Sequence, residues 1–421
     1  MSRLRELMEE LCPGGVEYKK LGEIAEIIRG NGLQKKDFVD QGIGCIHYGQ
    51  IYTRYGAFAD RTLTYVTPQL AATLKTVSNG DLVVAITSEN VEDVCKCVAW
   101  LGEDDIVTGG HAAIVKHKQN PKYLAYLFQT EDFFRQKRKY VVGTKVIEMS
   151  PKKLAEIIIP VPPLEIQNEI VKLLDNFTEL TAELTAELTL RKKQYNFYRD
   201  SLLNFVRVDD TIVQTDRQTD RQVQRISKFG LWRKEFEVEW KMLGEVCGLK
   251  AGTAISASCI REQKNDVYKT PCYGGNGLRG YVQEVNHYSD APLIGRQGAL
   301  CGNVCFAKAP YYATEHAVIV DGKKNFNNRF LFHVLVNMNL GQYKTAGAQP
   351  GLSVKRLNKV KIAIPKLEIQ NSIANILDRF DTLCNDLTSG LPAEIAARKK
   401  QYEHYRDRLL TFPRSKLEER S

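Results

Sequence analysis

The sequence predicts an α+β protein in which two mixed α/β domains alternate with two long helices, and these helices are expected to pair as an antiparallel coiled coil. Two observations support this fold class. Two helical segments are near copies of each other, and the segments before them carry short β-rich runs between glycine turns. At 421 residues the chain exceeds what one hydrophobic core usually serves, so more than one domain is expected.

The first mixed domain is predicted at residues 1–163 and the second at residues 235–366. Their β-rich runs include DLVVAIT at 81–87, HAAIVKH at 111–117 and HAVIVDG at 316–322. The two domains open on similar segments, EYKKLGEI at 17–24 and EWKMLGEV at 239–246, but their interiors diverge. His111 and His316 align between the halves, which indicates a shared structural place, such as a satisfied interior histidine.

The two long helices are predicted at residues 164–206 and 367–413. LEIQNEIVKLLDNF at 164–177 returns as LEIQNSIANILDRF at 367–380, and RKKQYNFYRDSLLNF at 191–205 returns as RKKQYEHYRDRLLTF at 398–412. Apolar side chains recur every three or four residues in both copies, which is the period of an amphipathic helix. At 1.5 Å per residue the first helix would be roughly 60 Å long, so it is expected to act as a strut.

The second helix carries four more residues than the first between its two repeated blocks. Gly390 and Pro392 lie in this insertion, and both residues disfavour a continuous helix. We therefore expect a kink or an interruption there. Two amphipathic helices of one chain with a large domain between them are expected to pack antiparallel.

A polar linker is predicted at residues 207–234, between the two halves. Its central tract, TDRQTDRQVQR at 215–225, is polar and of low complexity, which is typical of an exposed connection.

Composition places the chain among soluble proteins of the cytoplasm. No run of 18 apolar residues is present, and the N-terminus lacks the apolar region of a signal peptide, so neither a membrane partner nor export is expected. The cysteines are scattered without zinc-ribbon spacing, so reduced thiols and no metal site are predicted. The net charge of +9 suits a polyanionic partner.

Motifs for catalysis are not found in the sequence. NPKY at 120–123 lacks the second proline of the adenine methyltransferase motif, and no glycine-rich cofactor turn precedes it. The sequence also lacks a G-x-x-x-x-G-K-[ST] phosphate loop. We therefore expect a protein that is not an enzyme by itself and that binds no cofactor.

Together, the repeated LEIQN and RKKQY blocks, the matching openings and the divergent interiors resemble the specificity subunit of type I restriction–modification enzymes over nearly the whole chain. The resemblance implies two target-recognition domains with pseudo-twofold symmetry that read a bipartite site on double-stranded DNA. It implies helices that set the half-site spacing and dock two methyltransferase subunits, and motor-nuclease subunits in the full complex. S-adenosylmethionine, ATP and Mg are then expected on those partner subunits.

The resemblance also singles out glycine-rich loops as DNA-reading candidates. HYGQIYTRYG at 47–56, YGGNGLRGY at 273–281 and IGRQGALCGNV at 294–304 are similar to motifs of these domains, and GTKVIEMS at 143–150 and GAQPGLS at 347–353 precede the helices. Glycine lets the backbone approach phosphates, while Arg suits guanine and Asn or Gln suits adenine. The candidates are Tyr48, Gln50, Tyr52, Arg54, Lys145, Tyr273, Asn276, Arg279, Arg296, Gln297, Asn303 and Gln349.

Repeated side chains on the helices are candidates for binding partner subunits. They are Arg191, Lys192, Tyr195, Tyr198, Arg398, Lys399, Tyr402 and Tyr405. The tyrosines are explained most economically as coiled-coil packing, and the lysines as solvated faces or partner contacts. A different class of function also stays open, a coiled-coil scaffold whose two domains bind protein or glycan ligands.

Overall fold

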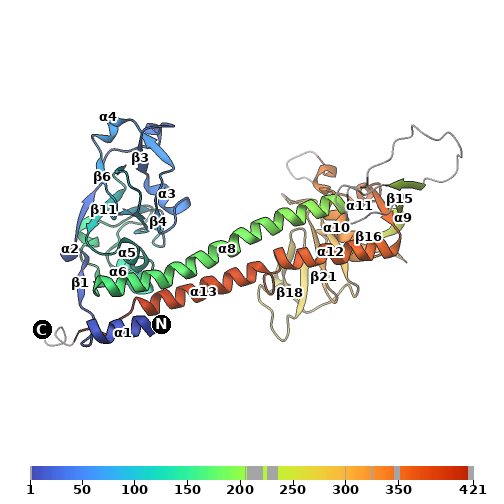
Figure 1. Ribbon diagram of the computed structural model, residues 1–421. Helices are drawn as coiled ribbons and strands as arrows, with labels where there is room; N and C mark the ends of the chain where they lie inside the picture. The colour runs from blue at the N-terminus through green and yellow to red at the C-terminus, as the bar shows by residue number, and fades with distance from the viewer. Residues whose placement is uncertain are drawn as a thin grey trace. The chain divides into compact units, whose positions relative to one another are not determined.

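The computed structural model describes residues 2–203, 205, 221–224, 236–298, 300–323, 326–345 and 351–415. The chain divides into two compact units, one formed by residues 1–184 with 395–421 and the other by residues 185–394. Each unit contains one mixed α/β domain and part of the 40-residue helix α8 (Leu164–Leu203), seen in green in Figure 1. The predicted fold class is confirmed.

The centre of the first unit is a five-stranded sheet with the order β2-β11-β7-β9-β4. Its strands are β2 (Ala25–Arg29), β11 (Ala112–His117), β7 (Leu82–Ala85), β9 (Cys97–Trp100) and β4 (Phe58–Ala59). Side chains of β7 are buried on both faces, which explains its continuous apolar sequence. Leu82 and Val84 pack with α5 (Pro121–Leu127) in one core, and Val83 and Ala85 pack in a second core on the other face.

The other elements of the first unit surround this sheet. They are α1 (Ser2–Leu11), β1 (Tyr18–Lys20), α2 (Leu21–Ile24), β3 (Ile43–Ile46), α3 (Tyr48–Thr53), β5 (Thr64–Val66), α4 (Pro68–Ala71), β6 (Lys75–Val77), β8 (Thr87–Ser88), β10 (Ile106–Thr108), α6 (Glu131–Tyr140), β12 (Ile147–Glu148), α7 (Pro151–Leu154) and β13 (Ile158–Pro160). A four-stranded sheet has the order β5-β3-β10-β6, and β1 pairs with β13.

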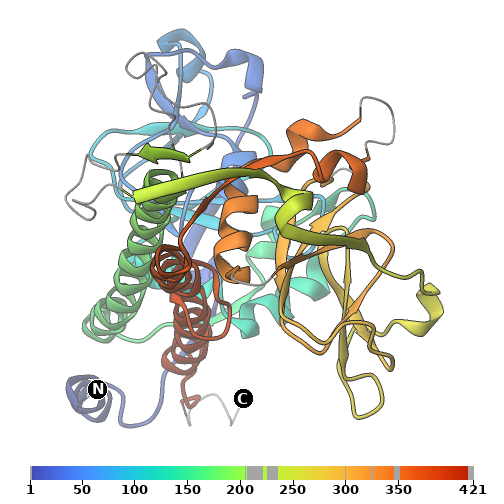
Figure 2. The ribbon, with the colours of Figure 1, turned by 90° about the vertical axis from the view of Figure 1, so that its right-hand side faces the viewer.

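The second unit repeats this plan with a sheet of order β16-β22-β19-β20. Figure 2 shows the orange helix α10 (Asn328–Asn337) beside these strands. The elements are β15 (Phe236–Met242), α9 (Leu243–Val246), β16 (Cys247–Ala251), β17 (Thr270–Gly274), β18 (Gly277–Val282), β19 (Ala291–Gly295), β20 (Val304–Ala307), β21 (Tyr312–Ala313), β22 (Ala317–Gly322), α11 (Val354–Leu357) and β23 (Lys361–Pro365). The chain then continues into α12 (Leu367–Asn385) and α13 (Leu391–Leu409).

Of the predicted linker, the structure describes residues 221–224, and these form a strand. Within residues 207–234, β14 (Arg221–Gln224) pairs antiparallel with β15, so this part is a strand at the edge of the sheet β14-β15-β23. Backbone pairing with β15, the next strand along the chain, forms it, and its polar sequence did not signal that pairing. The remaining residues of the predicted linker lie outside the described part of the chain.

The predicted interruption of the second long helix is confirmed. α12 ends at Asn385 and α13 begins at Leu391. Between them, the Asp386 carboxylate accepts hydrogen bonds from the Thr388 backbone N–H at 2.7 Å and from the Ser389 hydroxyl at 2.6 Å. A Cβ on Gly390 would lie 2.4 Å from the Thr382 carbonyl oxygen, so this turn requires glycine.

Each domain is anchored to its helix by the glutamine of the repeated LEIQN block. In the first unit, the buried Gln167 accepts a hydrogen bond from the Asn120 backbone N–H at 2.9 Å and donates to the Pro162 carbonyl at 2.8 Å. In the second unit, Gln370 accepts from the Asn327 backbone N–H at 3.0 Å and donates to the Pro365 carbonyl at 2.9 Å. The repeated glutamine therefore joins the start of α5 or α10 to the helix.

About two turns further along each helix, an aspartate makes a second anchor. Asp175 of α8 forms an ion pair with Lys122 at 2.6 Å and accepts a hydrogen bond from the Tyr126 hydroxyl at 2.6 Å. We call Lys122, Tyr126, Gln167 and Asp175 the first seat. Its counterpart, the second seat, consists of Arg329, His333, Gln370 and Asp378. There Asp378 of α12 lies 2.6 Å from both the Arg329 guanidinium and the His333 Nε2.

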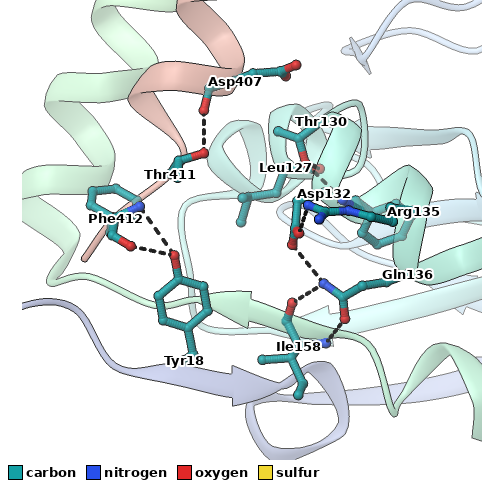
Figure 3. Close-up of polar contacts among 11 residues, drawn as sticks. Tyr18, Leu127, Thr130, Asp132, Arg135, Gln136, Ile158, Asp407, Thr411 and Phe412 are labelled. Atoms are coloured by element: carbon teal, nitrogen blue, oxygen red, sulfur yellow. Dashed lines mark hydrogen bonds and ion pairs between the residues drawn. The ribbon is translucent and has the colours of Figure 1, made fainter. Parts of the chain in front are cut away.

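The C-terminal segment completes the first unit. The Tyr18 hydroxyl donates to the Phe412 carbonyl at 2.9 Å and accepts from the Phe412 backbone N–H at 3.2 Å, as Figure 3 shows. Val16 also forms a parallel bridge with Arg414, whose guanidinium lies 4.9 Å from the Tyr18 ring centroid. These contacts close the first domain with residues from the other end of the chain.

Candidate nucleic-acid interface

A pocket of about 460 Å³ lies at the tip of the β17–β18 hairpin in the second domain. The residues that line it are Gly274, Gly275, Asn276, Gly277, Leu278, Arg279, Gln297, Gly298 and His316. The structure therefore brings together three of the predicted reading residues, Asn276, Arg279 and Gln297. They come from two glycine-rich segments that are about 20 residues apart in the sequence.

Close backbone contact between glycines holds the two segments together. A Cβ on Gly295, at the end of β19, would lie 1.9 Å from the Gly275 carbonyl oxygen, so a side chain at 295 would push the hairpin away. Gly277 has a φ of +97°, which favours glycine and permits the tight turn after Asn276. The glycines that resembled a family motif thus have a specific role in shaping this pocket.

The polar side chains of this pocket are available to a ligand. Within the described residues, the side chains of Asn276, Arg279 and Gln297 make no hydrogen bond or ion pair, and all three residues are exposed. Beneath them, the Oγ1 of the fully buried Thr314 has no partner in the described part of the chain. Unpaired polar groups that surround a hollow are typical of a site that receives polar atoms from a ligand.

His316 was not among the predicted reading residues, but its side chain lines the pocket. Its Nε2 lies 3.2 Å from Glu315 Oε1, and its Nδ1 is buried and has no partner among the described residues. His111 and His316 do share a structural place, since each directly precedes a central strand, β11 or β22. The expected satisfied interior histidine is wrong for both, because His111 is exposed and the His316 side chain is 42% exposed. Their alignment was the signal that could have identified His316.

The other described candidates of the second domain lie outside this pocket. The half-buried Tyr273 packs its ring against Tyr311 at 5.7 Å, and burial raises its pKa. Arg296 is half-buried, and Asn303 is exposed beyond the pocket lining. Gln349 lies outside the described residues.

In the first domain, three candidates are engaged in internal contacts. Gln50 accepts a hydrogen bond from the His47 backbone N–H at 3.0 Å and donates to the Thr64 hydroxyl at 3.2 Å. The Tyr52 hydroxyl donates to the Thr87 carbonyl, and burial raises the pKa of Tyr52. The Tyr48 ring packs against the His111 ring at 4.8 Å. These contacts organise α3 and its surroundings.

Arg54 and Lys145 are the exposed candidates of the first domain. Arg54 directly follows α3, and Lys145 lies in the loop that leads into β12. Neither side chain has a partner among the residues that the structure describes, so both are available to a phosphate or a base edge.

The helix tyrosines pack inside the units. Tyr198 stacks on Phe380 at 5.3 Å between ring centroids, and Tyr405 stacks on Phe177 at 5.4 Å. Burial raises the pKa of Tyr195 to about 12 and that of Tyr402 to about 12. The stacking of Tyr198 and Tyr405 is typical of packing between helices, whereas Tyr402 also packs against Tyr126 of α5. Partner binding by these tyrosines stays a prediction.

The basic candidates on the helices divide into two kinds. Arg191 and Arg398 each donate to a glutamine three residues later, at 3.0 Å and 3.2 Å. Lys192 and Lys399 are exposed. The two lysines are the members of this set that best suit a partner contact.

The described residues do not contain a group of three or more His, Cys, Asp or Glu side chains that could hold a metal ion. Cys45, Cys95 and Cys97 of the first domain are buried, and burial raises the pKa of Cys95 to about 12, so this thiol stays protonated near neutrality. Among the helices in the described part of the chain, none combines the length and apolar character that a membrane span requires.

Comparison with a protein family shows a match in both halves. The family model of the type I restriction modification DNA specificity domain matches residues 13–190 and 236–397, more than half of the chain. Each matched segment contains most of one mixed domain and a large part of the helical region that follows it.

Individual proteins are similar as well. The type I restriction enzyme EcoprrI specificity subunit of Escherichia coli is 48% identical over 235 residues, which are 54% of this chain and 52% of that protein. The EcoR124I/EcoR124II specificity subunit of E. coli is 34% identical over 276 residues, 61% of each chain. The matches thus span about half to three fifths of these relatives. A putative type I specificity subunit of Haemophilus influenzae is 29% identical over 98% of this chain and 100% of its own.

Solved structures show a similar fold. The S subunit of a type I restriction-modification system from M. genitalium has a TM-score of 0.57 at 14% identity, with 94% of this chain and 96% of that chain covered. A chain from a study of complex assembly in a type I R-M system also has a TM-score of 0.57, at 17% identity, and 95% and 98% are covered. At these identities the likeness concerns the fold.

Proposed function

The chain belongs to the family of type I restriction–modification DNA specificity domains, and from this premise we propose that it is the specificity subunit of a type I restriction–modification complex. Each mixed domain reads one half of a bipartite site on double-stranded DNA. The chain carries out no catalysis by itself, and it directs methylation or restriction by its partners to that site.

The observation that carries this proposal is the contrast between constant anchors and variable tips. The repeated glutamine and aspartate fasten each domain to a helix in the same way. The glycine-rich tip of the second domain instead presents Asn276, Arg279 and Gln297 without internal partners. Constant anchors with divergent polar tips suit a protein whose two domains read different base sequences. The net charge of +9 favours approach to DNA.

Partner subunits supply the chemistry in this proposal. Two methyltransferase subunits dock on the helices and domains and carry S-adenosylmethionine, and motor-nuclease subunits of the full complex carry ATP and Mg. The exposed Lys192 and Lys399 occupy equivalent places in the repeat, so they are suitable contacts for two copies of one partner. The proposed place of the complex is the cytoplasm.

The helices set the distance between the half-sites in this proposal. An insertion of one helical turn at residues 178–190 lengthens α8 by about 5.4 Å, which corresponds to one or two base pairs at about 3.4 Å each. We expect the preferred spacer to change by that amount, as measured by methylation of a library of spacer lengths. An unchanged spacer would contradict the spacing role.

The main test is co-expression of this chain with the methyltransferase encoded beside it, followed by genome-wide mapping of methylated adenines by single-molecule sequencing. We expect a split motif with a fixed gap that is present only when this chain is present. A soluble complex without new methylation would contradict the proposal. Pull-down of protein or glycan ligands without DNA binding would instead favour the scaffold alternative.

A further inference from the structure

The pocket of the second domain combines an unpaired guanidinium with amide side chains. Arg279 lies on β18, and Gln297 lies just beyond the end of β19, so two different strands place their side chains around one hollow. Asn276 belongs to the hairpin turn and adds a second amide. Such groups match the donor and acceptor atoms of base edges.

The position of Arg279 is defined by its neighbours. A Cβ on Gly274 would lie 3.6 Å from the Arg279 Cδ and 3.7 Å from the Thr314 Oγ1, so the arginine stem lies across this glycine and near the buried threonine. The hairpin register pairs Gly274 with Gly277, two residues before Arg279. The guanidinium is therefore held at the hollow by a short hairpin and not by a long loop.

The surroundings of the pocket favour a base over a phosphate. The Glu315 carboxylate is next to the pocket, because its Oε1 lies 3.2 Å from Nε2 of the pocket residue His316. Burial raises the pKa of the Cys272 thiol, the positive charge of Arg279 lowers it and the negative charge of Glu315 raises it. A carboxylate repels a phosphate, whereas it can accept a hydrogen bond from a base amino group.

We propose that Arg279 is a specificity-determining residue that reads a guanine in the half-site of the second domain, by donating two hydrogen bonds to guanine O6 and N7. This inference rests on the proposed function. Gln297, across the same pocket, is then available to the neighbouring base. Two arginines of this domain were predicted to read DNA. The proposal assigns the guanine to Arg279 and not to Arg296, because Arg296 does not line the pocket.

The first experiment maps methylation for variants in the assembled complex with the methyltransferase. Arg279→Ala should relax one guanine position of the second half-site, with roughly a five- to hundredfold loss of preference, and leave the first half-site unchanged. Arg279→Gln should shift the preference at that position towards adenine. Lys308→Ala is the matched control, because it removes one exposed positive charge from the same domain outside the pocket, and it should leave the motif unchanged.

The second experiment uses duplexes that carry the mapped motif with 7-deazaguanine at that position. This base lacks the N7 acceptor, so it should weaken binding by the wild-type complex but not further weaken binding by the Arg279→Ala complex, whose residue 279 has no donor. Three results would each overturn the assignment. The second half-site could lack guanine, both variants could keep the wild-type selectivity, or the wild type and the variant could be equally sensitive to 7-deazaguanine. If the wild-type complex gave no split motif, the proposed function itself would fail.

Discussion

The first and second seats have the same geometry and different chemistry. Both use a buried glutamine and an aspartate of the helix to hold the domain. The first aspartate is paired with a lysine and a tyrosine, whereas the second is paired with an arginine and a histidine.

The cation of each seat also lies over aromatic rings, and the second seat has more of these contacts than the first. Lys122 lies over the Phe58 ring at 4.3 Å, and Arg329 lies over the rings of Phe306 and Phe332 at 4.4 and 4.8 Å. Arg329 also reaches Asp381 at 3.4 Å. The repeat thus preserves a place for a cation and a hydrogen-bond donor, whereas the residue types that supply them differ between the two seats. The second seat has the denser network, so we expect its aspartate to matter more.

The largest expected effect comes from the glutamines. Gln167→Leu removes hydrogen bonds to the Asn120 N–H, the Pro162 carbonyl and Gln119, whereas Gln370→Leu removes two equivalent bonds. At roughly 1 kcal/mol per bond, the first variant should lose about 3 kcal/mol of local stability and the second about 2 kcal/mol. Hydrogen exchange of peptides that contain α5 and α10 measures both losses. Equal protection in variant and wild type would show that the glutamines do not anchor the domains.

The aspartates should separate the two seats. Asp378→Ala leaves Nε2 of the fully buried His333 without its acceptor and removes the closer of the two carboxylates that Arg329 contacts, so we expect a loss of about 2 kcal/mol in the second unit. Asp175→Ala should cost about 1 kcal/mol in the first unit, because Lys122 keeps its contact with Phe58. Urea unfolding monitored by hydrogen exchange in each unit gives both values. A larger loss for Asp175→Ala would reverse the order proposed for the seats.

Acid should weaken the second seat through Asp378. Burial raises the pKa of Asp378, but the hydrogen bonds from His333 and Arg329 outweigh burial, so this pKa lies below its ordinary value of 3.8. A lowered folded-state pKa means that the stabilisation is complete above 3.8 and is lost as the pH falls further. Wild type and Asp378→Asn should therefore differ in the stability of the second unit at pH 6 and converge below pH 3.8. A constant difference over this range would exclude Asp378 as the titrating group.

The smallest expected effect is the exchange of the cations. Arg329→Lys keeps the charge but loses the planar contact with two rings and the reach to Asp381, so a loss of about 1 kcal/mol is expected. The reverse change, Lys122→Arg, should alter the stability of the first unit by less than about 0.5 kcal/mol. Thermal unfolding of both variants, compared with wild type, tests whether the two seats tolerate exchange.

Local sequence signals predicted the helices and the break between them. The three- to four-residue period defined α8, and Gly390 with Pro392 marked the interruption, because both effects act within one or two turns. The glutamine of LEIQN was seen as a repeat, but its anchoring role was not. Its partner Asn120 lies 47 residues away in the sequence, and no local pattern joins the two.

The strand β14, the role of Gln50 and the pocket of the second domain were not predicted, because each depends on contacts between separate segments of the chain. β14 forms because its backbone pairs with β15, which a polar sequence does not reveal. Gln50 and Arg54 belong to one glycine-containing motif, yet only the structure shows that Gln50 bonds to Thr64 and that Arg54 is exposed. The pocket around Arg279 depends on the contact of Gly275 with Gly295. The sequence indicated the loops of these two glycines as separate candidates and did not show that they touch.

The bridge between Val16 and Arg414 has a consequence for how the protein is made. A ribosome releases the chain from its N-terminus, so residues 1–184 emerge first but lack the segment 395–415 that closes their domain. Residues 185–394 form a unit from one uninterrupted stretch of chain. The domain synthesised second is therefore complete first, and the domain synthesised first waits for residues 395–415 to follow it.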